Sequence, residues 1–341
     1  MATTGQDSRL DPLVIMAVRQ NGVGILRAAL PGLKPHLDEP CVGRDTLLTL
    51  AARHGSTECV RLLLSEGSSV DAPCAPPSAT ALYVATQEGL PQVVRVLLDA
   101  KADVTDTVGD GLTPLSVAVH QGGKSHAECA RLLLSASQQA AIGAKKLDDC
   151  DEHGVNLLLK ASYMGHDEIV KHLLKAGASV HHTDASGASA LIVACRNGHA
   201  KCVQLLLKAG SGVDVAIADG GGTALHFAAK AGSADCVKQL LSAKANPTYA
   251  SQSTGTTPLH IACQVGSLDC ARLLLEGRAN VQTADKDGVP PLFLAESQGH
   301  KAVAKLLLKQ GADRASHKFV GDSEPSDDLI GAIASKLGFG S

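Results

Sequence analysis

The sequence predicts an all-α repeat solenoid, in which consecutive pairs of short helices stack on one another. Three observations predict this fold class. A unit of about 33 residues recurs along almost the whole chain of 341 residues. Each copy carries apolar residues at helical spacing on both sides of a turn. Hydrophobic residues make up 45% of the chain but aromatic residues only 2%, so the core must be built from small side chains that allow close helix packing.

The copies align on one position, which we call the anchor. The clearest copy reads Thr-Pro-Leu-His-Ile-Ala-Cys-Gln-Val-Gly at residues 257–266. Successive anchors lie 33 or 34 residues apart, except for a gap of 43 between Thr113 and Asn156. This spacing predicts about nine repeats. The anchors are Pro12, Thr46, Thr80, Thr113, Asn156, Ser189, Thr223, Thr257 and Pro290.

Each unit begins with a short helix, because the anchor Thr is a good N-cap and Pro often follows it in the first turn. A glycine nine residues after the anchor ends this helix in a left-handed turn, and Asn21 takes that place in the first copy. A second helix follows and carries a run of three leucines, as at residues 273–275. An Asp-x-x-Gly turn, as at residues 285–288, closes a β-turn finger.

Residues 223–232 read Thr-Ala-Leu-His-Phe-Ala-Ala-Lys-Ala-Gly. This motif resembles the ankyrin repeat, and the resemblance covers roughly residues 10–315. It implies a stack of helix-turn-helix units with β-turn fingers. It also implies that His226 and His260, at the fourth motif position, make structural hydrogen bonds. One helix pair cannot bury its own apolar face, so each repeat needs its neighbours.

The long gap after Thr113 combines a three-residue insertion between the helices with about seven extra residues in 135–147, where Gln, Ala and Lys favour a longer second helix. The C-terminal residues form an apolar pattern that would cover the last repeat or bind a partner. The predicted organisation is a disordered N-terminus (1–10), a degenerate capping repeat (11–42), a first block of repeats (43–136), an inter-block insertion (137–152), a second block (153–315), a linker (316–326) and an amphipathic helix (327–341).

Most of the ten cysteines recur at two repeat positions, which predicts small buried side chains and not a metal or disulfide framework. Equivalent cysteines in adjacent repeats should lie beyond the ~7 Å limit for a disulfide. Cys41, Cys74 and Cys150 fall in fingers or loops and are candidates for reactive thiols. The seven recurring cysteines are Cys59, Cys129, Cys195, Cys202, Cys236, Cys263 and Cys270.

A possible nucleotide site comprises Gly122, Gly123, Lys124 and Ser125, which resemble a relaxed phosphate-binding loop. Such a loop needs a strand before it, whereas a helix is predicted there. No recognisable nucleophile arrangement occurs either. We therefore predict a non-enzyme without cofactor or metal, and keep a nucleotide-binding switch as an alternative.

The net charge of −3 gives no basic footprint for nucleic acid or an anionic membrane. Residues 1–11 lack a basic region followed by an apolar stretch, and no segment is long and apolar enough to span a bilayer. These features predict a cytoplasmic monomer that neither binds nucleic acid nor inserts into membranes. A nuclear location remains the alternative.

The family resemblance implies that the concave face recognises a protein. This face would consist of the finger tips and the residues seven and eight after each anchor. Tyr163 and Met164 have the composition of an interaction hot spot, although Tyr163 could instead pack over the neighbouring insertion. The predicted function is a non-catalytic scaffold or adaptor, with a regulatory subunit or inhibitor of a specific enzyme as the alternative. The predicted protein-binding residues are Arg53, His54, His120, His153, Tyr163, Met164, Arg196, Asn197 and Lys230.

Overall fold

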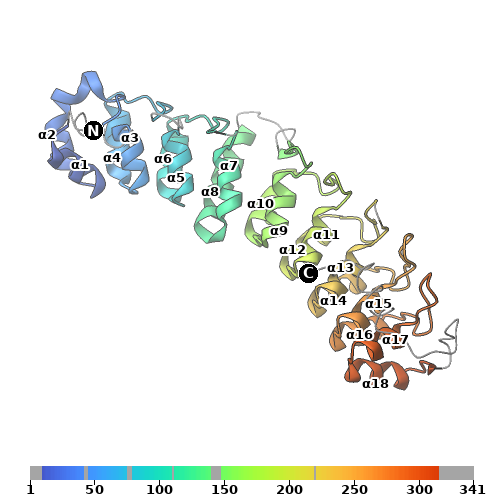
Figure 1. Ribbon diagram of the computed structural model, residues 1–341. Coiled ribbons are helices and arrows are strands. Elements are labelled where there is room, and N and C mark those ends of the chain that lie inside the picture. Colours follow the sequence, from blue (N-terminus) through green and yellow to red (C-terminus); the bar gives the residue numbers. More distant parts are fainter. Residues whose placement is uncertain are drawn as a thin grey trace, which may run out of the picture. The chain divides into compact units, whose positions relative to one another are not determined.

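The computed structural model describes residues 10–41, 45–74, 79–109, 111–139, 147–218 and 220–314. Within these ranges the chain forms the α-helices α1 to α18 and one short 3-10 helix, η1 (Lys34–His36). The described residues contain isolated β-bridges, such as Thr183 with Ser189, but no strand. The fold is the predicted all-α repeat solenoid, and the consecutive helix pairs are compatible with about nine repeats (Figure 1).

Each repeat contains a first helix and a second helix. The first helices are α1 (Pro12–Arg19), α3 (Leu47–Arg53), α5 (Ala81–Gln87), α7 (Pro114–Gln121), α9 (Leu157–Met164), α11 (Ala190–Arg196), α13 (Ala224–Lys230), α15 (Pro258–Gln264) and α17 (Pro291–Ser297). The second helices are α2 (Val23–Leu33), α4 (Thr57–Ser65), α6 (Pro91–Asp99), α8 (Gly123–Gln139), α10 (Asp167–Lys175), α12 (Ala200–Lys208), α14 (Ala234–Ser242), α16 (Leu268–Glu276) and α18 (Lys301–Lys309).

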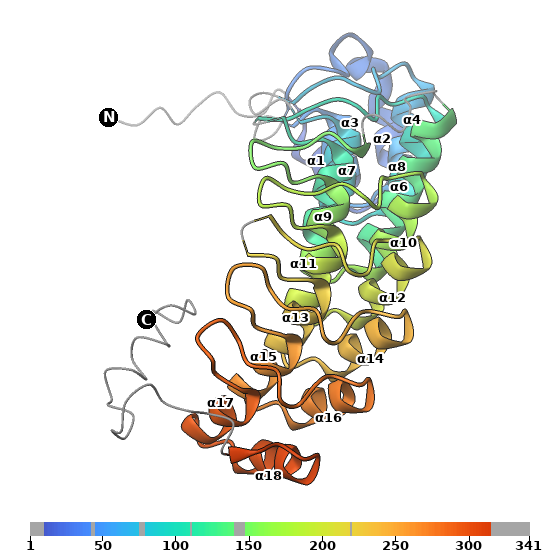
Figure 2. The same ribbon diagram turned by 90° about the vertical axis from the view of Figure 1, so that its right-hand side faces the viewer.

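The chain divides into two units, Met1–His182 and Thr183–Ser341. In unit 1, which contains α1 to α10, each first helix contacts the next first helix and each second helix contacts the next second helix. Unit 2, which contains α11 to α18, repeats this arrangement. Each unit therefore consists of two helix layers, with the fingers along one edge (Figure 2).

The anchors cap the first helices as expected. The side chains of Thr46, Thr80 and Thr113 each accept a hydrogen bond from the backbone N–H three residues later. At Thr223 and Thr257 a histidine completes a reciprocal capping arrangement. These caps explain why a helix of only seven or eight residues begins at each of these anchors. At the proline anchors the cap differs, since Asp11 caps α1 and Pro290 provides no side-chain cap for α17.

His226 and His260 make the structural hydrogen bonds that the resemblance implied. The backbone N–H of Thr223 donates to Nδ1 of His226 (3.2 Å), whose Nε2 donates to the carbonyl of Thr256 in the next repeat (3.1 Å). His260 bonds the carbonyl of Val289 in the same way (3.1 Å). Burial lowers the pKa of each histidine to about 4. Neutral imidazoles therefore join neighbouring repeats.

The glycines that end the first helices adopt the left-handed backbone conformation, and at some of them a side chain would also lack space. Gly122 and Gly266 have φ of 67° and 72°, and a Cβ at either would clash with the ring of His166 or His300 from the next repeat. Asn21 adopts the same left-handed conformation, with φ of 58°. Its Oδ1 accepts hydrogen bonds from the backbone of Glu58 (3.1 Å) and Cys59 (3.2 Å), so it also caps α4.

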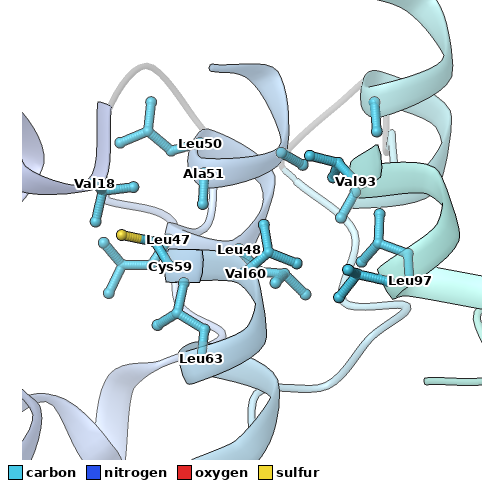
Figure 3. Close-up of a cluster of buried hydrophobic side chains, with 14 of the residues drawn as sticks. Val18, Leu47, Leu48, Leu50, Ala51, Cys59, Val60, Leu63, Val93 and Leu97 are labelled. Carbon is cyan, nitrogen blue, oxygen red and sulfur yellow. The ribbon is translucent and has the colours of Figure 1, made fainter. Parts of the chain in front are cut away.

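The core consists of small aliphatic side chains and thiols shared between successive pairs. Figure 3 shows Cys59 of α4 among Val18, Leu47 and Leu63, which come from three helices. All seven recurring cysteines are buried, which confirms the prediction for them. Of the other three, Cys74 is buried, Cys41 is half-buried and donates its S–H to the carbonyl of Asp45, and Cys150 is exposed.

The insertion after Thr113 lengthens α8 to 17 residues, as its composition predicted, whereas most other second helices have nine. The three-residue insertion also places His126 at the point of the repeat where the regular spacing would place Gly123. The His126 ring lies against the turn of the preceding repeat, and its Nε2 donates a hydrogen bond to the carbonyl of Gln87 (3.1 Å). Residues 1–9 of the predicted disordered N-terminus (1–10), the linker (316–326) and the C-terminal helix (327–341) lie outside the described residues. The boundaries at 11–42, 43–136, 137–152 and 153–315 stay predictions.

Among the described residues, no helix combines the length and apolarity that crossing a bilayer requires.

Candidate protein-interaction surface

The ends of the first helices form one edge of each unit, which we call the first-helix face. In unit 1, the contacts of α3 with α5, α5 with α7 and α7 with α9 place the terminal residues of these helices in sequence along this edge. In unit 2, α11, α13, α15 and α17 do the same. The face contains eight of the nine predicted binding residues, and His153 lies on a finger of unit 1 instead.

Tyr163 is the largest exposed apolar group on the first-helix face of unit 1. It lies in the last turn of α9, and 60% of its surface is exposed. Met164, the final residue of the same helix, is half-buried. An aromatic ring and a thioether therefore lie together at the surface, where a partner could bury both. The alternative, that Tyr163 packs over the insertion at 137–152, stays a prediction, because residues 140–146 lie outside the described part of the chain.

Arg53 is held by charged neighbours from two repeats. Its Nε and Nη2 donate to the two carboxylate oxygens of Asp45 at 2.9 and 3.0 Å, and its Nη1 lies 3.8 Å from Glu88 Oε1. The hydrogen bond with Asp45 raises the pKa of Arg53. His54 is exposed beside it. Asp45 was missed in the sequence, because it belongs to a finger and not to the helix that it orients.

Arg196 and Asn197 at the end of α11 are also ordered by local contacts. The guanidinium carbon of Arg196 lies 4.7 Å from the ring centroid of Phe227 in α13. The Nδ2 of Asn197 donates to the carbonyl of Val193 (2.9 Å). Lys230, which ends α13, is exposed on the same edge. Unit 2 thus presents two cationic side chains on adjacent first helices, one of them stacked.

The two remaining predicted residues are separate from these groups. His120 is exposed at the end of α7. His153 is exposed on its finger, with Nε2 3.6 Å from Glu152 Oε1. The neighbouring finger is held by His182, whose Nε2 donates to the carbonyl of Gly154 (2.8 Å). His153 is therefore a largely solvated side chain, whereas His182 joins two fingers.

A ladder of finger side chains was not foreseen from the sequence. In four fingers a carboxylate accepts a hydrogen bond at 3.0 Å from the backbone N–H of a residue 31 or 32 positions later, in the next finger. An acidic residue recurring at the repeat period was the signal that could have identified it. The ladder fixes the spacing of the finger tips. The pairs are Asp38 with Ser69, Asp71 with Asp103, Asp148 with Ser179, and Asp214 with Asn246.

Unit 1 also contains a cavity of 690 Å³ next to α8 and α9. Leu112, Leu134 and Val155 supply apolar walls, and Lys160 and the exposed thiol of Cys150 supply polar ones. No cluster of three or more His, Cys, Asp or Glu side chains within the described ranges is arranged to hold a metal ion.

The phosphate-loop pattern does not have the expected backbone context. Gly122 and Gly123, with φ of 67° and 80°, connect helix α7 to helix α8. A helix therefore stands where a phosphate-binding loop has a strand. Lys124 and Ser125 are exposed in the first turn of α8.

Comparison with known proteins identifies the repeat. The family described as "Ankyrin repeats (3 copies)" matches residues 14–108, 101–184, 158–251 and 243–316. Cortactin-binding protein 2 of Rattus norvegicus is 38% identical over 91 residues, which are 26% of this chain and 6% of that protein. SH3 and multiple ankyrin repeat domains protein 2 of Homo sapiens is 32% identical over 156 residues, 46% of this chain and 8% of that protein.

Ankyrin repeat and SOCS box protein 11 of Danio rerio is 38% identical over 130 residues, which are 38% of this chain and 39% of that protein. The chain thus spans well under half of each of these three relatives.

Proposed function

Because this chain belongs to the ankyrin-repeat family, we propose that it is a non-catalytic scaffold or adaptor that binds a partner protein through its first-helix face. The observation that carries the proposal is the exposure of Tyr163, 60% of whose surface is accessible beside Met164. The proposed site also comprises Arg53, His54 and the other predicted binding residues of this face. A cytoplasmic, monomeric protein is part of the proposal.

Several side chains of the proposed site are held in place before any partner binds. Interface energy concentrates in a few Tyr, Trp and Arg side chains, each typically contributing about 2 kcal/mol or more. Binding costs less when such groups are already fixed. Arg53 is fixed by Asp45, and Arg196 by the ring of Phe227. Unit 1 therefore offers an ordered cation and an exposed aromatic ring on its first-helix face, and unit 2 offers an ordered cation on its own.

A regulatory subunit or inhibitor of a specific enzyme would use the same face, so the identity of the partner distinguishes this alternative from a scaffold. A nucleotide switch is not favoured, because Gly122 and Gly123 join two helices. What the relatives' names state about cortactin, SH3 domains or a SOCS box describes those proteins, and none of it is assigned to this chain.

The proposal is tested by affinity capture and mass spectrometry with the full chain and a variant carrying Tyr163→Ala, Met164→Ala and Arg196→Ala. Circular dichroism first verifies that both are folded. A protein that is lost from the variant, but retained by a control with Gln204→Ala and Lys238→Ala on second helices, supports the first-helix face. Retention of every captured protein by the triple variant overturns it.

A further inference from the structure

Six exposed basic side chains on or just after the second helices of unit 2 have no described ion-pair partner. α18 places Lys301, Lys305 and Lys309 four residues apart, so they lie in one row along the helix. Lys208, Lys244 and Arg278 lie at the C-terminal ends of α12, α14 and α16, which contact one another in order up to α18. We call these six exposed residues the basic row. Within the described ranges, none of their side chains has an ion pair or hydrogen bond.

In unit 1, four basic side chains of the second helices have an acidic partner nearby, whereas Arg27, Lys175 and Lys101, which follows α6, have no described ion pair. Such pairs on a solvated surface neutralise charge locally. In unit 2, Arg272 forms a pair of this kind with Asp269 on α16. The unit 1 pairs are Arg61 with Glu58 (3.6 Å), Arg95 with Glu128 (3.8 Å), Arg131 with Glu128 (2.6 Å) and Lys171 with Glu168 (2.9 Å).

Two members of the basic row adopt an unfavourable backbone conformation. Lys244 and Arg278 have φ of 69° and 71°, in the left-handed region. The equivalent residues after α12 and α18 are Gly210 and Gly311, which adopt this region without a steric penalty. A cation near a helix C-terminus interacts favourably with the helix dipole, which offsets only part of that penalty.

The lysines of α18 carry further local penalties. Lys301 is the first residue of the helix, where a cation opposes the helix dipole. Lys301 with Lys305, and Lys305 with Lys309, are like-charge neighbours at a spacing of four. Unfavourable backbone conformations and charge interactions that no neighbouring contact offsets are typical of functional surfaces. An anionic segment lying on the basic row would relieve the repulsion.

The chain itself contains such a segment. Residues 322–328 read Asp-Ser-Glu-Pro-Ser-Asp-Asp, with four acidic residues and no lysine or arginine. The described chain ends at Arg314, five residues after α18. The seven residues 315–321 can span at most about 25 Å. Packed helices lie about 8–10 Å apart, so the acidic segment can reach α18, α16 and α14.

We propose that residues 322–328 of this chain lie on the basic row. Four screened ion pairs hold a separate acidic peptide only with a Kd of about 1 mM or weaker. A short tether supplies an effective concentration of the order of millimolar, so the same contacts suffice within one chain. Leu329 and Ile330 follow directly, and Leu308 of α18 is an exposed apolar side chain that they can cover. A partner that needs the basic row must displace this segment.

Zero-length carbodiimide cross-linking of the full chain, read by peptide mass spectrometry, tests the contact. We expect amide links from Lys301, Lys305, Lys309 or Lys244 to the acidic residues of 322–328. Lys230 and Lys286 are the internal comparison, because they belong to unit 2 but not to its second helices. Equal linkage to Lys230 and Lys286 would show that the segment has no preferred site and would overturn the proposal.

Charge reversal supplies the matched variants, and Lys305 and Lys309 are both exposed. Lys305→Glu with Lys309→Glu should lower linkage to α18 about tenfold, as expected when two screened pairs become repulsive. Asp322→Lys with Asp327→Lys should do the same, and combining both sets should restore linkage between 322–328 and α18. Absence of restoration contradicts the proposal. Links between two chains instead of within one would assign the basic row to a second copy and would also contradict it.

Discussion

Arg196 of α11 lies over the ring of Phe227 in α13, with its guanidinium carbon 4.7 Å from the ring centroid. The contact joins neighbouring first helices of unit 2 at the edge where partner binding is proposed. Stacking fixes the plane of the guanidinium but leaves its N–H groups available for hydrogen bonds. Arg196 is therefore positioned to bind a carboxylate.

A double-mutant cycle measures this contact. Arg196→Ala and Phe227→Leu should each lower the free energy of unfolding, and the coupling between them should be about 0.5–1 kcal/mol, as for a cation–π pair at an exposed site. Urea unfolding of the four proteins gives the coupling energy. Strictly additive effects would show that the stacking contributes nothing to stability.

The stability of unit 2 should fall between pH 7 and pH 5. Burial lowers the pKa of His226 and His260 to about 4, whereas the unfolded chain protonates its histidines near pH 6.5. The unfolded state then binds more protons, so stability is complete above about pH 6.5 and is lost as the pH falls toward 4. From pH 7 to pH 5 the two histidines together should account for about 3–4 kcal/mol.

Hydrogen exchange of α13 and α15 at the two pH values checks this prediction, with a variant carrying His226→Gln and His260→Gln as the control. The glutamines do not titrate, so the variant should show a much smaller change. The carboxylates with lowered pKa, such as Glu128 and Asp184, lose their contribution to the free energy of unfolding only at lower pH. An equal pH response of both proteins would exclude the two histidines as its cause.

Asn21 should stabilise the folded chain through its side chain as well as through its backbone conformation. Its Oδ1 caps α4 through Glu58 and Cys59 while its φ is 58°. Asn21→Gly keeps the backbone relaxed but removes the cap, which should lower the free energy of unfolding by about 1 kcal/mol. Asn21→Ala adds left-handed strain and should lower it by about 2–3 kcal/mol. Thermal unfolding compares the two, and equal stability of both variants would refute the strain component.

Lys244→Gly should raise stability, because glycine tolerates the φ of 69° that lysine adopts there. The expected gain is about 0.5–1 kcal/mol, reduced by the lost interaction with the helix dipole. Lys244→Ala removes the charge but keeps the strain, so it provides the control and should be no more stable than the original chain. A lower melting temperature for Lys244→Gly than for Lys244→Ala would contradict this account of the helix end.

The fold was predictable because the same capping, turn and apolar patterns recur from repeat to repeat. Thr257 caps a helix, Gly266 ends it, and an apolar run forms the next helix, so period and turn chemistry agree. The longer α8 followed from composition in the same way. Asn21 was recognised as a substitute for glycine, but its cap on α4 was not, because that contact joins residues 37 positions apart.

The candidate site was less predictable because exposure and pairing depend on neighbouring repeats. The repeat register gave the positions of Tyr163 and Arg196 on first helices. It did not give Asp45 as the partner of Arg53 or Phe227 as the partner of Arg196, since each pair joins different elements. The net charge of −3 also concealed the basic row, because a sum over the chain contains no information about where charges lie.

The measurement that tests the proposed function most directly is the affinity of a captured partner for the full chain and for the variant with Tyr163→Ala and Met164→Ala, by isothermal titration calorimetry. Loss of a hot-spot aromatic ring should raise the Kd at least about tenfold, whereas Gln204→Ala with Lys238→Ala on the second helices should change it less than about twofold. An unchanged Kd for the Tyr163 and Met164 variant, with the second-helix control weakened, would contradict binding through the first-helix face.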